Sequence, residues 1–324
     1  MQHNARIQKT LEAFGHDALL SCLETSDGYD GVRGVDFYGP RFPAVYRSAI
    51  RNFSSFHGRL PDAGRLPLAA DHLFFSKFFR IFPTNPNAAS KLNAVRFLDK
   101  ERFGEKVYVP RRFFISTTPS LPEDLSSVSG WLLKLDLGNA AQFKVPTGLG
   151  STQQRVIRHR VEKWFAAAPY GAQWGEWWYS ASPQRVFFEE DLTDRMTGDE
   201  YQFFMKRGRC VMFKKKRIFK ATAQRREKTV VAFYDCAGNH IPGTQSNFDV
   251  PDDLSISSHT DVMLETALQI AAYFDHIRVD FIVLHDEPAL GELTCCTMNA
   301  RIRYSNTALE AVARDAVRLD LSGI

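Results

Sequence analysis

The sequence has few cysteines and no long apolar run. Its five cysteines, of which Cys295 and Cys296 are adjacent, show neither a disulfide framework nor the paired Cys-x-x-Cys spacing of a zinc site. No stretch approaches the roughly 20 apolar residues that span a bilayer. The first ten residues, "MQHNARIQKT", lack the apolar core of a signal peptide. We therefore expect a reduced, soluble, cytoplasmic protein, and leave association with a membrane surface open.

The sequence also lacks a strong excess of either charge. There are 41 Lys and Arg against 37 Asp and Glu, and this balance does not predict a nucleic-acid partner. However, Lys206 to Lys228 contains eleven basic residues and one acid, Glu227. These residues either form a solvated sheet edge that discourages strand pairing or attract an anionic acceptor such as an acidic glycan. The candidate substrate-binding residues in this stretch are Arg217, Lys220, Arg225 and Arg226.

The 324 residues, 44% of them apolar and 26 of them Phe, are enough for a large aromatic core. Helical and strand patterns mix along the chain, which predicts an α+β class. We expect a mixed, mostly helical segment over 1–85, ending at the Pro/Asn-rich break "RIFPTNPNAA". A first part over 86–185, with a strand-helix-strand insert from about 110 to 185, and a second part over 186–324 follow it.

Local patterns predict the main elements. The predicted helices are "YRSAIRNFSSFHGRL", "SKLNAVRFLDKERFG" with Ser90 as its cap, "TQQRVIRHRVEKWFAAAP" with Val156 and Val161 on its apolar side, and "HTDVMLETALQIAAYF". The predicted strands are "VYVPRRFFIST", two strands around Gly138-Asn139, "RVFFEED", and a hairpin turning at Arg207-Gly208.

A second hairpin, "HIRVDFIVLHDEPALGELTCC", carries one carboxylate in each strand, Asp280 and Glu292. Strand alternation puts Arg278 and Asp280 on one face. A tip of three or five residues places Asp280 opposite Glu292 and Arg278 opposite Thr294, with Cβ atoms about 5 Å apart. A two-residue tip would slip the register and separate them.

Two carboxylates at that distance repel each other unless they are neutralised. One shared proton, a nearby arginine or a hard cation could do this. Oxygen ligands without His or Cys suit Mg²⁺ or Mn²⁺. The plain alternative is a solvated hairpin face with an Arg278–Glu292 ion pair.

Two lysines and a double acid lie upstream. Lys134 is inside the apolar strand "WLLKLDL", where a lysine is costly unless it reaches solvent or an anion. Lys91 falls in the first turn of a predicted helix, a position that favours anions. Glu189 and Glu190 end the strand "VFFEEDL". Each of these residues could equally be a surface residue when taken singly.

In order and spacing, these pieces together resemble the ATP-grasp superfamily, and most closely its TupA-like branch, which is associated with bacterial surface-polysaccharide synthesis. The similarity covers about residues 75 to 300. The stretches that carry it are "SKLNAVRFL", "GWLLKLDLG", "GEWWY", "RVFFEEDL", "EYQFFMKRGRCVMF", "FYD" and "IRVDF…GELT".

The resemblance implies an ATP-grasp fold in which two α+β subdomains grip ATP. Lys91 and Lys134 would hold the phosphates, with Lys134 on a mobile lid over about 110–185. Glu189 and Glu190 would hydrogen-bond adenine and ribose, and Leu192 would close over the base.

The same resemblance assigns the metal and the reacting centre. Asp280 and Glu292 would bind Mg²⁺ (or Mn²⁺), with Thr294 as a further oxygen ligand, and Arg278 would face the transferring phosphoryl group. Two departures fall beside these residues. The branch has a His-Gly-Ser-Gly turn where this sequence has "LGNA" over 137–140, and Gln202 replaces a usual lysine.

The implied activity is an ATP-dependent carboxylate–amine ligase acting through an acyl phosphate, with an amino acid or other amine as donor and a uronic acid or similar carboxylate as acceptor. One alternative is an ATP-grasp kinase that phosphorylates a sugar or carrier hydroxyl. Another is a nucleic-acid or anionic-polymer binding module that uses the 206–228 stretch, with base stacking on its aromatic residues. In the ligase no nucleic-acid partner is expected.

Overall fold

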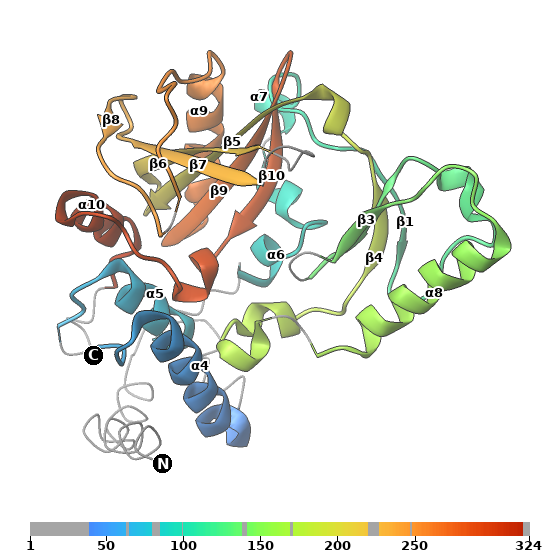
Figure 1. Cartoon of the computed structure of the whole chain (residues 1–324), viewed down its shortest axis with the longest axis horizontal. Helices are drawn as coiled ribbons and strands as arrows, with labels where there is room; N and C mark the ends of the chain where they lie inside the picture. Colours follow the sequence, from blue (N-terminus) through green and yellow to red (C-terminus); the bar gives the residue numbers. More distant parts are fainter. Residues whose placement is uncertain are drawn as a thin grey trace.

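The computed structural model describes residues 39–62, 65–79, 85–98, 100–137, 141–168, 171–219, 227–246 and 248–319. These residues build two antiparallel sheets with helices around them, which confirms the α+β class (Figure 1). The larger sheet has six strands in the order β10-β9-β5-β6-β7-β8, and the smaller has four in the order β1-β4-β2-β3.

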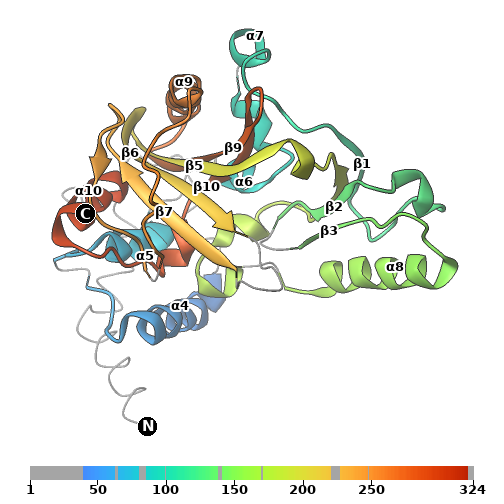
Figure 2. The ribbon, with the colours of Figure 1, turned by 45° about the horizontal axis from the view of Figure 1, so that its top comes forward.

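The larger sheet is formed entirely by the second half of the chain. Its strands are β5 (Met196–Lys206), β6 (Arg209–Phe219), β7 (Lys228–Tyr234), β8 (His240–Ile241), β9 (His276–Leu284) and β10 (Pro288–Thr294). The β5–β6 hairpin turns at Arg207 and Gly208, both at positive φ, as the sequence predicted. Helix α9 (Thr260–Ala271), also predicted, covers one face (Figure 2).

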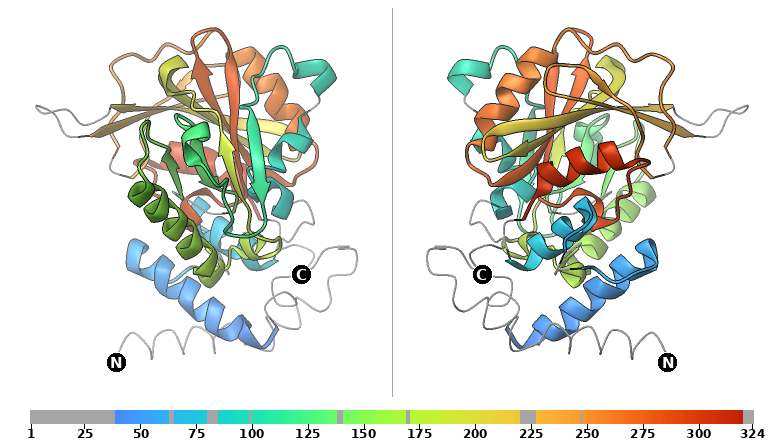
Figure 3. Two further views of the ribbon diagram at one scale, coloured as in Figure 1. Left: turned by 90° about the vertical axis from the view of Figure 1, so that its right-hand side faces the viewer. Right: turned by 90° about the vertical axis from the view of Figure 1, so that its left-hand side faces the viewer.

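Helices from both ends of the described chain cover part of the opposite face. Figure 3 shows α10 (Thr307–Val317), α5 (Ala69–Phe79) and α4 (Phe42–His57) stacked on that side. Rings of α4 and α5 interlock, with Tyr46 and Phe78 at 5.0 Å between centroids in an edge-to-face arrangement. The predicted helix near the amino terminus, "RIQKTLEAFGHDALLSCLE", lies outside the described residues.

The predicted helix "SKLNAVRFLDKERFG" does not form as one element. After α6 (Asn85–Ala89), the chain makes a turn, a 3₁₀ turn η2 (Ala94–Phe97) and the short α7 (Lys100–Phe103). The carboxylate of Asp136 accepts hydrogen bonds from the Ser90 hydroxyl at 2.9 Å and from the Leu92 amide at 3.0 Å. The Asp136 carboxylate thus holds the start of this segment against the small sheet.

The smaller sheet has its own core. Its strands are β1 (Arg112–Ser116), β2 (Leu132–Leu135), β3 (Gln142–Lys144) and β4 (Val186–Glu189), and α8 (Ser151–Ala166) packs on them. Because β4 pairs with β1 and β2, this part of the chain extends to Glu189, beyond the boundary predicted at 186. Val161 is buried as predicted, but Val156 is 63% exposed, and Ile157 takes its place in the core.

Short 3₁₀ turns link these elements: η1 (Gly39–Arg41), η3 (Leu125–Val128), η4 (Ala172–Trp174), η5 (Trp177–Ser180), η6 (Thr193–Arg195) and η7 (Thr297–Ala300). Every helix in the described ranges is too short or too polar to span a membrane.

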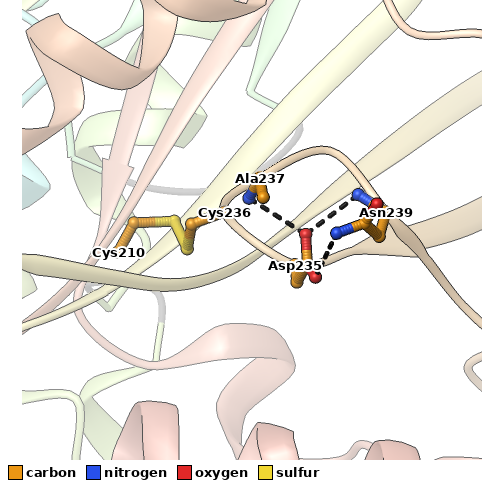
Figure 4. The surroundings of a disulfide bond; sticks show 5 residues. All are labelled: Cys210, Asp235, Cys236, Ala237 and Asn239. Atoms are coloured by element: carbon orange, nitrogen blue, oxygen red, sulfur yellow. Dashed lines mark hydrogen bonds between the residues drawn. A yellow bond between two sulfur atoms is a disulfide. The ribbon is translucent and has the colours of Figure 1, made fainter.

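The prediction of no disulfide is wrong. Cys210 at the start of β6 and Cys236 in the turn after β7 form a disulfide with Cα atoms 6.1 Å apart (Figure 4). The turn beside it is fixed by Asp235, whose carboxylate accepts from the amides of Ala237 and Asn239 at 2.9 Å. The two cysteines are 26 residues apart in the sequence, and only the pairing of β6 with β7 brings them together.

Candidate active site

The β9–β10 hairpin reaches the predicted register by an unexpected route. Near the tip Val283 pairs with Pro288, so the tip holds four residues and the strands are slipped by one. A bulge between Leu290 and Leu293 then restores the register, so that Arg278 lies opposite Thr294 as predicted. As a result, Asp280 faces the bulged part of β10, where Gly291 and Glu292 stand against a single residue.

A glycine is needed at that bulge. A Cβ atom built on Gly291 would lie 3.0 Å from the backbone oxygen of Asp280. The absence of a side chain at position 291 therefore lets β10 approach the strand that carries Asp280.

Arg278 joins the acids of the two strands. Its Nε and Nη2 donate to the two carboxylate oxygens of Asp280 at 2.7 and 2.6 Å. The same Nη2 donates to Glu292 Oε1 at 3.2 Å and to Thr294 Oγ1 at 3.0 Å. A shared proton, an arginine or a hard cation could neutralise the two acids, and the structure contains the arginine. The Arg278–Glu292 ion pair, which was the alternative to a metal site, also forms.

Burial separates this group from an ordinary surface ion pair. Arg278 is 7% and Asp280 8% exposed, whereas the Glu292 side chain is 54% exposed. Burial raises the pKa of Asp280, and the Arg278 guanidinium opposes that shift. Burial would lower the pKa of Arg278, but the adjacent carboxylates outweigh it and raise that pKa. The hairpin thus keeps a fixed cation beside two acids, one buried and one open to solvent.

The polar side chains around Arg278 continue onto the neighbouring strands β5 and β6. Gln202 of β5 lies opposite Asp280, and its Nε2 donates to Asp280 Oδ2 at 3.0 Å. Lys214 of β6 lies opposite Gln202 and donates to Gln245 Oε1 at 3.0 Å. Burial, together with the charge of Arg278, lowers the pKa of Lys214 to about 7, although Asp280 opposes the shift. Lys214 is a site residue that the sequence reasoning missed.

The other predicted residues come from the small sheet and the segment before it. Lys134 of β2 and Arg112 of β1 both pair with the Glu189 carboxylate at the end of β4, the latter at 2.8 Å. Lys91 donates to the backbone oxygen of Asp136, just after β2, at 2.9 Å. The structure therefore gathers Lys91, Lys134 and Glu189 over one face of this sheet.

Lys91 links this group to the hairpin. Burial lowers its pKa, and the carboxylate of Glu292 is the leading charge that opposes the shift, ahead of Asp136 and Glu189. Helix α6, which precedes Lys91, packs beside β10 (Figure 1). The ammonium of Lys91 thus lies within electrostatic reach of both the hairpin and the small sheet.

The residues predicted to line the base lie near the connection between the sheets. Glu190 accepts from the Tyr108 hydroxyl at 2.5 Å and from Arg111 Nε at 3.1 Å. Leu192 is buried against Leu284 and Ala289, with Ile282, two residues beyond Asp280, packed on the same cluster.

Arg217, the predicted substrate residue of the basic stretch that lies within the described ranges, does not join this group. Arg217 lies on the opposite face of β6 from Lys214, and both its Nε and Nη2 bind the Asp199 carboxylate, at 2.5 and 2.7 Å. Lys220, Arg225 and Arg226 lie outside the described residues. Lys216 of the same stretch pairs with Glu200 at 2.7 Å, and Lys206 with Asp275 at 2.6 Å.

The donor set suits a hard cation. Asp280, Glu292 and Thr294 offer only oxygen atoms, and Gln202 adds a buried amide oxygen that has no hydrogen-bond partner. A carboxylate oxygen has about two lone pairs, so the bond from Arg278 Nε leaves one on Asp280 Oδ1, whereas Oδ2 accepts from both Arg278 and Gln202. Within the described ranges no cluster of three or more His, Cys, Asp or Glu side chains has metal-binding geometry. Mg²⁺ commonly takes one or two carboxylates and completes its shell with water or phosphate.

No protein-family profile and no curated protein matches this sequence. Similar solved structures include the ATP-grasp ligase PsnB with its minimal precursor, at 15% identity and a TM-score of 0.38, covering 67% of this chain. The D-alanine–D-alanine ligase of Bacillus anthracis with ATP is another, at 13% identity and a TM-score of 0.37, covering 64% of this chain. The macrocyclase MdnC of Microcystis aeruginosa, bound with precursor peptide MdnA, has 13% identity, a TM-score of 0.35 and 67% coverage.

This chain spans only 55%, 56% and 55% of those three proteins, respectively. Similarities of this size carry no argument about activity, which has to come from the chain's own residues. The TupA-like branch stays a prediction.

Proposed function

We propose that this chain is an ATP-grasp enzyme that joins a carboxylate to an amine at the expense of ATP. The observation that carries the proposal is the convergence at the hairpin. Arg278, Asp280, Glu292 and Thr294 contact one another on one sheet face. Lys91 donates to Asp136 beside the small sheet with Lys134, and the charge of Glu292 in the hairpin acts on its ammonium. Cations and oxygen ligands from two sheets are what a nucleotide triphosphate with its divalent ion requires.

In this proposal Asp280, Glu292 and Thr294 hold Mg²⁺ (or Mn²⁺), with the Gln202 amide oxygen next to them. A bound divalent ion neutralises the phosphate charge during transfer. Lys91 and Lys134 hold phosphate oxygens. The ammonium of Lys134 has three N–H donors, so it can keep its ion pair with Glu189 while it binds a phosphate.

The base and ribose then lie at the connection between the sheets. Glu189 and Glu190 accept hydrogen bonds there, and Leu192 covers the base from the cluster it forms with Leu284 and Ala289. The small sheet with its separate core acts as the lid, which keeps water from the reactive intermediate.

The chemistry has two steps. A carboxylate oxygen of the acceptor attacks the γ-phosphorus of ATP, the bond to the bridging oxygen breaks, and ADP and an acyl phosphate form. The amine then attacks the carbonyl carbon, the carbon–oxygen bond to phosphate breaks, and inorganic phosphate leaves while the nitrogen loses a proton. Arg278 and Lys214 stabilise the phosphoryl charge, and no protein nucleophile is required.

The substrates follow from the TupA-like sequence resemblance alone: a uronic acid or similar carboxylate, an amino acid or other amine, and a role in bacterial surface-polysaccharide synthesis in the cytoplasm. A kinase that stops after phosphoryl transfer uses the same residues. The polymer-binding alternative is not favoured, because Lys206, Lys216 and Arg217 of the basic stretch are all paired with acids.

The proposal is tested by ADP release with pools of uronic acids and amino acids, read out by product mass. A ligase needs both substrates and releases phosphate, whereas a kinase leaves a phosphorylated product and no free phosphate. Asp280→Asn should lower turnover by about 10²–10³-fold, because a site that stabilises transition-state charge loses a charged ligand. The matched control is Glu287→Gln, a tip carboxylate paired with Arg195, which should retain turnover. Full turnover in Asp280→Asn would contradict the proposal.

A further inference from the structure

One stripe of helix α10 borders two cavities. The helix packs on α5 and on strands β5 and β6 of the large sheet (Figure 3). Ala311, Arg314, Asp315 and Arg318 follow one another at spacings of three and four residues, so they lie on one side of the helix. Asp315 and Arg318 line both cavities, which therefore lie on either side of these two residues.

The first cavity, called here the α5–α10 cavity, has a volume of about 430 Å³. This volume is within the range of sites that bind small molecules. Three guanidinium groups line it, those of Arg65, Arg314 and Arg318, together with one carboxylate, that of Asp315. The cavity is thus large enough for a ligand and carries an excess of positive charge.

The walls of the α5–α10 cavity are held in place by the protein itself. Leu66, which lines it, has a φ of +43°, a region that residues other than glycine rarely adopt. The fully buried Asp71 holds this loop, since its carboxylate accepts from the Leu68 amide at 3.2 Å. On the other side, the buried His72 accepts from the Leu319 amide at 2.9 Å through Nδ1. The cavity therefore does not depend on a ligand for its shape.

The second cavity, called here the β5–β6 turn cavity, has a volume of about 380 Å³. Besides Asp315 and Arg318, it is lined by Lys206, Arg207 and Arg209 at the turn of the β5–β6 hairpin. Lys206 pairs with the Asp275 carboxylate at 2.6 Å, and so does Arg207 at 2.9 Å. Such ion pairs do not prevent a cation from binding a second anion, because an ammonium has three donors and a guanidinium has five.

The balance of charge at the two cavities favours an anionic ligand. Among the described residues, six cations line them, against the lining acid Asp315 and the adjacent Asp275. The excess of four positive charges is as large as the formal net charge of the whole chain. The carboxyl end of α10 contributes about half a negative charge through the helix dipole, which is too little to offset it.

Arginines account for this excess. Lys206 pairs with Asp275, and Arg209 Nη2 lies 3.4 Å from the Asp315 carboxylate. The cations beyond these pairs are Arg65, Arg207, Arg314 and Arg318. Arginine binds phosphate well because its planar fork can donate two parallel hydrogen bonds to one phosphate group.

We propose that the two cavities form one binding site for a molecule that carries a diphosphate group, with one phosphate in each cavity and Arg318 shared between them. Two phosphate groups carry about three to four negative charges at pH 7, which matches the excess of positive charge. None of the residues Arg278, Asp280 and Glu292 lines either cavity. This site is therefore separate from the candidate active site, and the inference goes beyond the proposed ligase function.

The test is calorimetric titration of the full chain with inorganic pyrophosphate, in buffer with EDTA and without ATP. Pyrophosphate should bind saturably and about tenfold or more tightly than inorganic phosphate, which fills only one cavity. Arg318→Gln removes the guanidinium shared by both cavities and should weaken pyrophosphate binding by about tenfold or more, since a hydrogen bond between charged groups is lost. Arg155→Gln, at an exposed arginine of α8, is the control and should bind like the native chain.

A second variant keeps the native arginines. Residue 311 is exposed on α10, and glutamate is a good helix former, so Ala311→Glu should keep the native melting temperature. Its carboxylate adds a like charge to the wall of the α5–α10 cavity and should weaken pyrophosphate binding by about tenfold or more. Ala311→Gln has nearly the same shape without the charge and should weaken binding less. Lys134→Gln, in the candidate active site, should bind pyrophosphate like the native chain.

A diphosphate can belong to a free metabolite or to the headgroup of a lipid. Sedimentation with phosphatidylcholine vesicles, with and without farnesyl diphosphate, distinguishes these sources. Sedimentation that requires the farnesyl diphosphate and is lost in Arg318→Gln supports the site with a lipid as its ligand. Saturable binding of pyrophosphate without such sedimentation supports the site with a free diphosphate.

Three results would overturn the inference. One is the absence of both pyrophosphate binding and sedimentation, and another is equal affinity for phosphate and pyrophosphate. The third is pyrophosphate binding that persists in Arg318→Gln and Ala311→Glu but is lost in Lys134→Gln, which would place the anion in the candidate active site. Failure of the ligase proposal looks different, because it removes turnover with ATP and leaves these binding measurements unchanged.

Discussion

At the residue scale, Arg278 defines the candidate site. One guanidinium contacts Asp280, Glu292 and Thr294, so three oxygen-bearing side chains are held in place before any ligand arrives. Such pre-organisation lowers the entropy that a phosphoryl-transfer site has to lose during the reaction. Arginine suits this role better than lysine because its planar fork binds a carboxylate through two nitrogens.

His276, at the start of the same strand, predicts a pH-dependent stability. Burial, together with the nearby Lys206 charge, lowers its pKa from 6.5 to about 4, although Asp275 opposes the shift. Below pH 6.5, His276 binds a proton in the unfolded chain but not in the folded chain. The stability that the neutral His276 contributes is therefore complete above pH 6.5 and is lost as the pH falls toward 4. The free energy of unfolding should fall by at most about 1.4 kcal/mol per pH unit and by about 3 kcal/mol in total.

The measurement is urea unfolding of the native chain and His276→Asn from pH 7 to pH 4. The asparagine can still donate to the Met205 carbonyl that His276 Nδ1 contacts at 3.2 Å. The free energy of unfolding of His276→Asn should fall less steeply than that of the native chain as the pH decreases. His159→Gln, an exposed position on α8, is the control and should follow the native profile. Identical slopes for all three proteins would contradict the prediction.

At the element scale, the bulge in β10 positions the acids. Gly291→Ala would put a Cβ 3.0 Å from the Asp280 backbone oxygen, which cannot move away like a flexible side chain. We expect a loss of about 1–3 kcal/mol in unfolding free energy and a larger loss of turnover, since Glu292 and Thr294 follow directly. Gly150→Ala, where the nearest atom is 3.8 Å away, should retain turnover, and any loss of stability should come only from the weaker cap at the start of α8. Native stability and turnover in Gly291→Ala would show that the bulge tolerates a side chain.

The two hairpins show how far sequence could predict this site. Alternation placed Arg278 and Asp280 on one face, and they do share it. The expected odd-numbered tip is wrong, yet the pairing of Arg278 with Thr294 is right, because a bulge offsets the four-residue tip. Sequence patterns do not reveal a bulge, since it depends on contacts between the strands.

The same limit explains why Lys214 was missed. A regular hairpin around Arg207-Gly208 would pair Gln202 with Phe213 and turn Lys214 away from Asp280. A register shift beyond Phe204 pairs Gln202 with Lys214 instead. Residues near the turn follow the sequence pattern, but those beyond the irregularity change faces.

The disulfide between β6 and the turn after β7 predicts a second stability effect. It closes a loop of 26 residues in sequence separation, so its loss through Cys236→Ser should lower the unfolding free energy by about 3 kcal/mol. Thiol titration in denaturant should find the thiols of Cys295 and Cys296 without reductant, and those of Cys210 and Cys236 only after reductant is added. Five reactive thiols, or a melting temperature unaffected by reductant, would contradict it. Disulfide bonds persist mainly in oxidising compartments, so this bond was not expected in a protein predicted to be cytoplasmic.

At the scale of the whole molecule, the candidate site is built across two bodies with separate cores. The small sheet packs around Leu133, Val161 and Phe188, and the large sheet belongs to a different cluster that includes α4 and α5. The sequence predicted separate parts because each has its own local pattern. It could not predict that Lys91 would sit near Glu292, since that proximity depends on the packing of α6 against β10.

This arrangement predicts that nucleotide binding protects both bodies together. With Mg²⁺ and a non-hydrolysable ATP analogue, amide hydrogen exchange should slow at least tenfold in β2 and β4 of the small sheet and in β9–β10 of the large one, because a shared ligand reduces local opening of each. Exchange at α8, which packs on the far side of the small-sheet core, serves as the internal control and should change less. Because the hairpin acids hold the ion, Asp280→Asn should lose the protection of β9–β10 while the Lys134 strand keeps part of its own. If exchange in the native chain slows in only one of the two sheets, the nucleotide does not bridge the two bodies. Lys91, Lys134 and the hairpin acids would then belong to separate sites.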